Sequence, residues 1–240
     1  IYDGTNRVQV NAAIRVRDQE ACPTAHDLVA ALDFEVTRGG GGTFVLAVDI
    51  SKAHRRVPVA PADWGLQACS QLPLGSAPGP REPVWLNTVG TYGVGSASYW
   101  WGRVGALLLR LLHYVAGGAG LRWALRFADD FLLASGGAKM WRPLAVSVLL
   151  LRGLGVPLKW CKFRGGFRTE WIGYFFDVEA REAGLSDARA AWAASWCARQ
   201  AAEKTVPMAE MREGLGRFSF AAALLVFTRL FLGPLYSWVA

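Results

Sequence analysis

Cysteine and histidine are scarce in this chain of 240 residues, which has four of the first and three of the second. The cysteines are scattered without a pair spacing, at Cys22, Cys69, Cys161 and Cys197. The histidines do not complete a zinc site with them, because zinc sites combine closely spaced Cys and His ligands. The sequence therefore predicts a reduced, intracellular protein without a structural metal.

Acidic residues are also in the minority, with 19 Asp and Glu against 26 Lys and Arg, so the formal net charge is +7. A pI near 9.5 accompanies this excess of basic residues. A basic surface favours a polyanionic partner, and phosphate is the first candidate, although many basic proteins bind no polyanion.

Apolar runs that could cross a bilayer without interruption are missing. Residues 218–240 are long enough, but Arg229 lies at the middle of the stretch and Gly233-Pro234 interrupts it, which predicts a buried helix followed by a turn. Residues 96–115 include Arg and His side chains and predict a half-buried helix. We expect no membrane span and, because the chain begins at Ile1 without a leader, a piece of a longer protein.

The chain does contain a pair of adjacent aspartates, Asp129 and Asp130, between two short apolar stretches at 121–127 and 131–134. The apolar stretches predict strands, so the pair is expected at the tip of a hairpin. Two neighbouring carboxylates in apolar surroundings repel each other and lose hydration, and a divalent cation is the usual remedy. A plain polar turn is the alternative, because Asp is a common turn residue.

A third acid, Asp49, ends the apolar run 43–50, as expected of a carboxylate at the end of a central strand. A helix cap or a turn is the alternative role for it. Over residues 43–163 the elements are expected in the order strand, helix, strand, strand, helix, strand. This is the split ferredoxin-like order, which brings the first strand beside the central hairpin. Asp49 is therefore predicted to meet Asp129 and Asp130 in space.

Further elements are expected around this core. Helices are predicted over 24–32, from about 97 to 115, over 138–154, over 186–203 and after Pro207, strands over 156–163 and 169–178, and a hairpin over 67–90. The packed stripe of the central helix is expected at Trp100, Val104, Leu107, Leu108, Leu111 and Val115. Trp192 and Trp196 lie one helical turn apart, which favours a place in the core over a base-stacking role.

Three carboxylates from two strands suit two-metal phosphoryl chemistry. In this context five stretches resemble, in order, the sequence motifs of the reverse transcriptases, most closely those of the retroelement and retroviral type. They are 48–59, with an acid at the end of a strand, 91–97, with a Gly-centred turn, Phe127-Ala128-Asp129-Asp130, 158–163, with its lysines, and 171–174. The likeness spans nearly the whole chain.

The resemblance implies roles for particular residues. The implied catalytic residues are Asp49, Asp129, Asp130 and Lys159, and Lys162 competes with Lys159 for the lysine role. The three acids are expected to hold two Mg²⁺ ions, with Mn²⁺ as the alternative. The implied nucleotide-binding residues are His54, Tyr92, Gly93 and Arg7, with Arg15 and Arg17 as further basic candidates, and the implied primer-grip residues are Trp171, Gly173 and Tyr174. His54 stands where the family usually has Tyr or Phe. Phe127 likewise replaces a Tyr.

The resemblance also implies an α+β fold with a right-hand polymerase palm built on a split βαββαβ ferredoxin-like sheet. The palm is expected at 43–180, partial fingers at 1–42 and the helical start of a thumb at 181–240. The implied activity is DNA synthesis directed by RNA, and also by DNA, with an RNA template, a DNA primer and deoxynucleoside triphosphates as partners and no membrane. Two alternatives stay open. One is a decayed or domesticated relative that only binds nucleic acid, and the other is an RNA-dependent RNA polymerase.

Overall fold

The computed structural model describes residues 5, 9–38, 42–70, 72, 76, 79, 83–203 and 205–239, so Arg7 lies outside the described residues. The elements are α1 (Val10–Ala13), α2 (Ala25–Thr37), β1 (Thr43–Asp49), η1 (Ala53–Arg56), η2 (Pro61–Gln67), β2 (Ala68–Cys69), β3 (Trp85–Leu86), α3 (Gly95–Gly117), β4 (Leu121–Phe127), β5 (Asp130–Gly136), α4 (Trp141–Gly153), η3 (Trp160–Lys162), β6 (Arg164–Gly166), β7 (Arg168–Trp171), β8 (Tyr174–Asp177), β9 (Glu182–Leu185), α5 (Asp187–Ala202), α6 (Met208–Leu224), η4 (Val226–Thr228) and α7 (Arg229–Val239).

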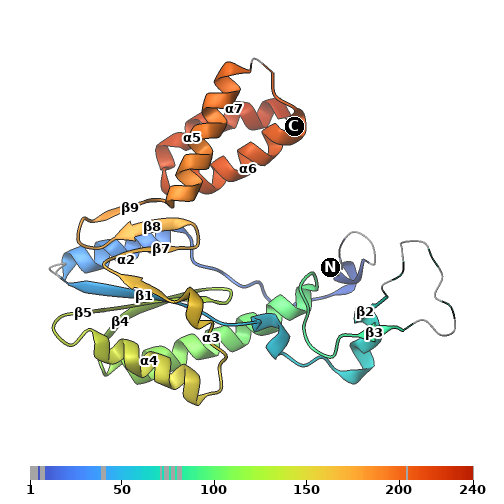
Figure 1. Cartoon of the computed structure of the whole chain (residues 1–240), viewed down its shortest axis with the longest axis horizontal. Coiled ribbons are helices and arrows are strands. Elements are labelled where there is room, and N and C mark those ends of the chain that lie inside the picture. Colours follow the sequence, from blue (N-terminus) through green and yellow to red (C-terminus); the bar gives the residue numbers. More distant parts are fainter. Residues whose placement is uncertain are drawn as a thin grey trace.

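The central sheet has the strand order β4-β5-β1-β6, and each neighbouring pair is antiparallel. With α3 before β4 and α4 before β6, the chain follows the βαββαβ order that the sequence predicts. Figure 1 shows α3 and α4 on one side of this sheet. On the other side lie α2 and a second sheet of β7, β8 and β9, and beyond them α5, α6 and α7.

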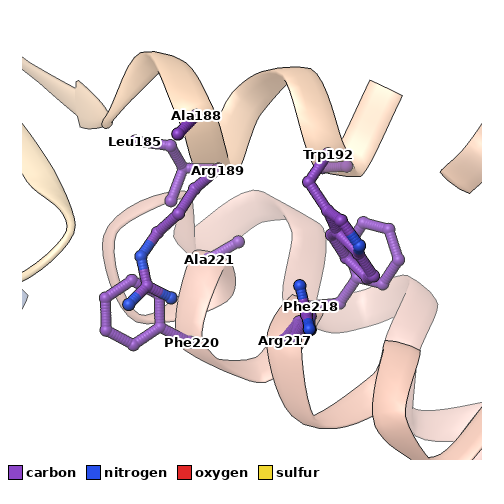
Figure 2. Close-up of a pocket in the computed structure, with 9 residues that line it drawn as sticks. Leu185, Ala188, Arg189, Trp192, Arg217, Phe218, Phe220 and Ala221 are labelled. Atoms are coloured by element: carbon purple, nitrogen blue, oxygen red, sulfur yellow. The ribbon is translucent and has the colours of Figure 1, made fainter. Parts of the chain in front are cut away.

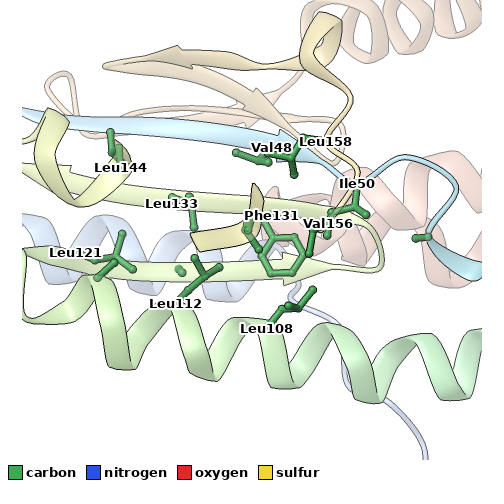
Figure 3. Packing of buried hydrophobic residues seen from close by; sticks show 14 of the residues in the cluster. Val48, Ile50, Leu108, Leu112, Leu121, Phe131, Leu133, Leu144, Val156 and Leu158 are labelled. Carbon is green, nitrogen blue, oxygen red and sulfur yellow. The ribbon is translucent and has the colours of Figure 1, made fainter. Parts of the chain in front are cut away.

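The alternation of side chains along β5 explains why the central sheet is covered on both faces. Phe131 and Leu133 belong to the core that the sheet forms with α3 and α4 (Figure 3). Leu132 and Ala134 belong to the core that the sheet forms with α2, β7 and β8. Successive residues of a strand point to opposite faces, so a continuous apolar run is what a strand buried on both faces requires.

The packed face of α3 differs from the predicted stripe. Leu108 is buried as expected, but Trp100 is 54% exposed and Leu107 is 55% exposed. The buried face instead contains Trp101, Leu108 and Leu112, so the prediction was wrong by about one position around the helix. The helix is apolar on most of its surface, and periodicity alone does not select a face in that case.

The strand predicted over 156–163 is also different in the structure. Leu158 makes a single bridge to Ile50, residues Trp160–Lys162 form a 3₁₀ turn, and pairing with β1 resumes in β6. Gly165 in β6 lies against the ring of Phe44, where an added Cβ would be 2.7 Å from Cε1. Strand β6 therefore needs glycine to lie this close to β1, and because glycine has a weak strand propensity the strand is not evident in the sequence.

The described C-terminal residues form α5, α6, the short η4 and α7, so the stretch 218–240 is not one buried helix followed by a turn. Helix α6 ends at Leu224, and Gly233 and Pro234 lie inside α7 and do not interrupt it. Leu230 is 81% exposed. Among the described residues, no helix has both the length and the apolar character needed to cross a membrane.

Candidate active site

Asp49, Asp129 and Asp130 meet at one end of the central sheet, as predicted. Asp49 is the last residue of β1 and lies directly opposite Asp130, the first residue of β5. Asp129 belongs to the two-residue turn between β4 and β5, and its carbonyl accepts a hydrogen bond from the Ile50 N–H at 3.0 Å. The turn therefore belongs to the same backbone network as the end of β1.

Burial and the crowding of like charge make the ionised form of Asp130 costly. Burial raises the pKa of Asp130 to about 6, and the negative charges of Asp129 and Asp49 and a hydrogen bond with Asp49 add to the rise. A rise in a carboxyl pKa means that the charged form is costly there. A cation at this position would lower that cost.

A lysine already supplies one positive charge. The Lys162 Nζ donates a hydrogen bond of 2.5 Å to Asp49 Oδ2, and this bond raises the pKa of the Lys162 ammonium. The Lys159 side chain is exposed, and its backbone N–H donates to the Asp49 carbonyl at 2.9 Å. The structure thus brings Lys162 to the carboxylates, because the 3₁₀ turn over Trp160–Lys162 carries it back towards β1.

The donor set suits a hard divalent cation, because every side-chain donor of the three acids is a carboxylate oxygen. The acids do not form a ready-made cradle, however. Over the part of the chain that the structure describes, no group of three or more His, Cys, Asp or Glu side chains is arranged to hold a metal ion. The Lys162 contact with Asp49 is consistent with this, since an ammonium already occupies one carboxylate oxygen.

Two of the predicted nucleotide-binding residues lie together. The rings of His54 and Tyr92 are 5.1 Å apart, and the His54 Nδ1 is buried without a hydrogen-bond partner. Gly93, the third, has a φ of 90°, a conformation that glycine adopts readily. Asn11 secures this turn by donating to the Gly93 carbonyl at 2.8 Å and accepting from the Gly95 N–H at 2.8 Å.

The predicted primer-grip residues form the hairpin of β7 and β8, but its two aromatic side chains face inward. Trp171 is 4% exposed and Tyr174 is 2% exposed. The Tyr174 hydroxyl donates to the Phe220 carbonyl at 2.8 Å, and the two rings stack at 4.4 Å. The turn at Ile172 and Gly173 is half-buried and has positive φ at both residues.

A cavity of about 470 Å³ joins this turn to the acidic group. Its lining includes Asp130, Ile172, Tyr174 and Arg189. Arg189, on α5, lies over the Phe220 ring at 4.1 Å, and an added Cβ on Gly173 would be 2.1 Å from its Nε. Arg189 is not evident as a site residue in the sequence, because an isolated arginine on a helix gives no signal of its own.

A second cavity, of about 450 Å³, lies between α5 and α6 (Figure 2). Arg189 beside Phe220 and Arg217 beside Trp192 stand at its two ends, and the Arg217 guanidinium is 4.3 Å from the Trp192 ring centre. Trp192 and Trp196 are half-buried against Phe218, so the expected core role is only partly met.

Comparisons with known proteins place the fold. No family model matches the chain, and no curated protein matches it in sequence. Among solved structures, the foamy viral protease-reverse transcriptase in complex with double-stranded DNA is similar at a TM-score of 0.65 and 13% identity, over 95% of this chain and 35% of that one. The same viral protein in complex with an RNA/DNA hybrid is similar at a TM-score of 0.58 and 14% identity, over 82% of this chain and 24% of that one.

These two likenesses show that the chain has a reverse-transcriptase-like fold. The chain spans about a third or less of the length of the viral proteins it matches.

Proposed function

We propose that this chain catalyses template-directed DNA synthesis from an RNA template, and from a DNA template as a second class, by nucleotidyl transfer. The observation that supports the proposal most is the meeting of Asp49, Asp129 and Asp130 at one sheet end within a reverse-transcriptase-like fold. A DNA primer and deoxynucleoside triphosphates complete the proposed partners. The net charge of +7 favours such polyanions.

In this proposal the central sheet with α3, α4 and the β7–β8 hairpin is the palm of a right-hand polymerase, at residues 43–180. Residues 1–42 are partial fingers, and α5, α6 and α7 begin the thumb at 181–240. The arrangement in Figure 1 supports the division, because α5–α7 lie to one side of the sheets as a separate helical layer. The retroelement origin is part of the same proposal.

Asp49, Asp129 and Asp130 would hold two Mg²⁺ ions, with Mn²⁺ as the alternative. When bound, such ions activate the attacking oxygen and neutralise charge on the phosphate. The contribution of the chain is to gather three carboxylates on adjacent strands, where their mutual repulsion favours a cation over the metal-free state. Because the pKa of Asp130 is raised, a proton competes with the cation for this carboxyl in mildly acidic solution.

Lys162 is the better candidate for the proton donor to the pyrophosphate leaving group, in preference to Lys159. Its ammonium donates a hydrogen bond to Asp49, whereas the contact of Lys159 with Asp49 is made through the backbone N–H. The hydrogen bond to Asp49 raises the Lys162 pKa and so keeps the proton on Nζ until Asp49 binds a cation in place of the ammonium. A general acid held in position speeds the reaction by giving its proton to the leaving group in the transition state.

The incoming nucleotide would lie along His54, Tyr92 and Gly93. The His54 ring is planar and packs beside the Tyr92 ring, so it can exclude a ribose 2′-hydroxyl sterically as the usual aromatic residue would. The primer end would lie against the Ile172-Gly173 turn and the Arg189 guanidinium, since the Trp171 and Tyr174 side chains are buried. Backbone and guanidinium contacts position a nucleic acid without reading its sequence.

Primer extension on an RNA template tests the proposal. The wild-type chain is expected to extend a DNA primer in the presence of Mg²⁺ or Mn²⁺, and Asp129→Asn is expected to abolish extension. Asp33→Asn, at an exposed position of α2, is the matched control and should retain wild-type extension. Equal activity of Asp129→Asn and the control would refute the role of the acids.

A second candidate is a nucleic-acid-binding protein without catalysis. It is favoured by the absence of a ready-made ion-binding group among the described residues and by the ion pair that already neutralises Asp49. Calorimetric titration with an RNA/DNA duplex, with and without Mg²⁺, separates the two. Duplex binding that Mg²⁺ does not change, together with no primer extension, would favour this candidate.

A further inference from the structure

The turn that carries Asp129 is held by its other residue, Ala128. The Ala128 carbonyl accepts two side-chain hydrogen bonds, from Arg126 Nη1 at 2.8 Å and from Trp101 Nε1 at 3.0 Å. Ala128 also has a φ of 50°, a left-handed conformation that residues other than Gly, Asn and Asp rarely adopt. The turn is therefore kept in an unfavourable shape by contacts from outside it.

Arg126 is itself fixed in place. Its side chain is 6% exposed and forms an ion pair with Glu20, from the segment before α2, and its Nη2 also donates to the Gly102 carbonyl at 3.3 Å. Two glycines of α3 make room for this arrangement. An added Cβ would be 2.4 Å from Glu20 Oε2 at Gly102 and 2.9 Å from the Arg126 side chain at Gly105.

A buried arginine is costly unless its charge is paired and its N–H groups are satisfied. The charge of Arg126 is paired with Glu20, and its Nη1 and Nη2 groups donate hydrogen bonds, one of them to the carbonyl of the residue adjacent to Asp129, a candidate metal ligand. Mutation of groups that orient metal ligands through hydrogen bonds typically lowers metal affinity by about 10- to 100-fold. An ordinary two-residue hairpin turn needs no such support.

We propose that Arg126, anchored by Glu20 and assisted by Trp101, is a positioning residue that holds the Asp129 turn and so keeps Asp129 beside Asp49 and Asp130, the acids proposed to bind a cation. The inference rests on the proposed function for what the cation does. The effect on the turn itself is independent of it. Arg126 touches no substrate in this view and acts only through the Ala128 carbonyl.

The test compares Arg126→Met with Arg122→Met in the full chain. Arg122 lies on the same strand, β4, and pairs with a glutamate from the same N-terminal part of the chain, Glu35, but does not contact the turn. Both variants leave a glutamate without its arginine, so both are expected to lower the melting temperature. If the role of Arg126 were purely structural, the two variants would also have similar effects on amide exchange in the turn and on Mn²⁺ affinity.

Two readouts follow the turn. The first is amide hydrogen exchange at Ile50, whose N–H donates to the Asp129 carbonyl, measured by NMR without metal. Arg126→Met is expected to accelerate it by about 10-fold or more relative to Arg122→Met, since a loosened turn opens locally. The second is Mn²⁺ affinity, which should fall by roughly 10- to 100-fold in Arg126→Met and stay near wild type in Arg122→Met.

Equal exchange rates and equal Mn²⁺ affinities in the two variants would overturn the inference. If the wild type binds no Mn²⁺ but Ile50 exchange still separates the variants, the positioning of the turn stands and the proposed metal chemistry fails. Trp101→Phe provides the same comparison should Arg126→Met not fold, because it removes one donor to Ala128 and keeps an aromatic ring. Wild-type exchange at Ile50 in a folded Trp101→Phe would count against the inference.

Discussion

Replacing Asp130 by Asn is expected to stabilise the metal-free protein near neutral pH while removing a proposed metal ligand. The pKa of Asp130 in the folded chain is about 6, against 3.8 for an ordinary aspartate, and burial is the first cause. Above pH 6 the folded protein therefore carries a charge that the unfolded chain carries at lower cost. Asn keeps the shape of the side chain, can donate to Asp49, and has no charge.

The size of the effect follows from this difference. The rise of the Asp130 pKa from 3.8 to about 6 on folding corresponds to a loss of folding free energy of roughly 3 kcal/mol, at about 1.36 kcal/mol per pKa unit. Because Asp130 is only half-buried, solvent screening reduces the gain to about 1–2 kcal/mol. For a chain of this length such a gain raises the melting temperature by about 3–6 °C.

The pH dependence gives the sign of the effect. A carboxyl whose pKa is raised on folding lowers the free energy of unfolding as the pH rises from 3.8 to about 6, because the unfolded chain loses its proton first. The gain of Asp130→Asn over wild type should thus be full above pH 6 and vanish below 3.8. Thermal melts in a metal-free buffer series, with a chelator present, measure it.

A variant that is less stable than wild type above pH 6 in chelator would refute this account of the acidic group. So would a gain that does not change with pH. Asp33→Asn, on the exposed side of α2, is the control for any general effect of removing one negative charge. Added Mg²⁺ should reverse the order if the ion binds the acids, because a ligand stabilises only the state that binds it.

Two other substitutions test the assignments at the rim of the site. Lys162→Ala is expected to slow single-nucleotide incorporation by about 10²-fold, as for loss of a general acid, with Lys159→Ala near wild type. The reverse order would restore Lys159 to the role. Tyr174→Phe is expected to cost about 1 kcal/mol in a denaturant melt, from loss of the hydroxyl bond to Phe220. Its primer-template affinity should be unchanged, and a fall in affinity without a fall in stability would show direct contact with the primer.

Local sequence patterns were sufficient for much of the fold. The apolar runs that became β1 and β5, the acid at the end of β1 and the hairpin at Asp129 were all expected, and together they predicted the sheet order. Helix α2 begins at Ala25, within one residue of the predicted start, and Thr24 caps it: the Thr24 N–H donates to Asp27 at 2.7 Å. These features depend on neighbours within a few residues, so a single sequence contains the information.

Tertiary structure decided the choices between residues of similar chemistry. Lys162 reaches Asp49 because Trp160–Lys162 turns as a 3₁₀ helix, and nothing in the spacing of two lysines distinguishes it from Lys159. The inward direction of Tyr174 likewise depends on α6, which lies far away in the chain.

The support of the Asp129 turn shows the same division most clearly. Both aspartates of the pair are evident in the sequence, but Arg126 and Trp101 converge on the Ala128 carbonyl only because α3 packs against β4. The sequence by itself determined β1, β4 and β5 and the acids at their ends, because apolar runs of strand length are visible locally. Tertiary structure alone decided which donors complete the site, because hydrogen bonds between distant segments depend on how whole elements pack.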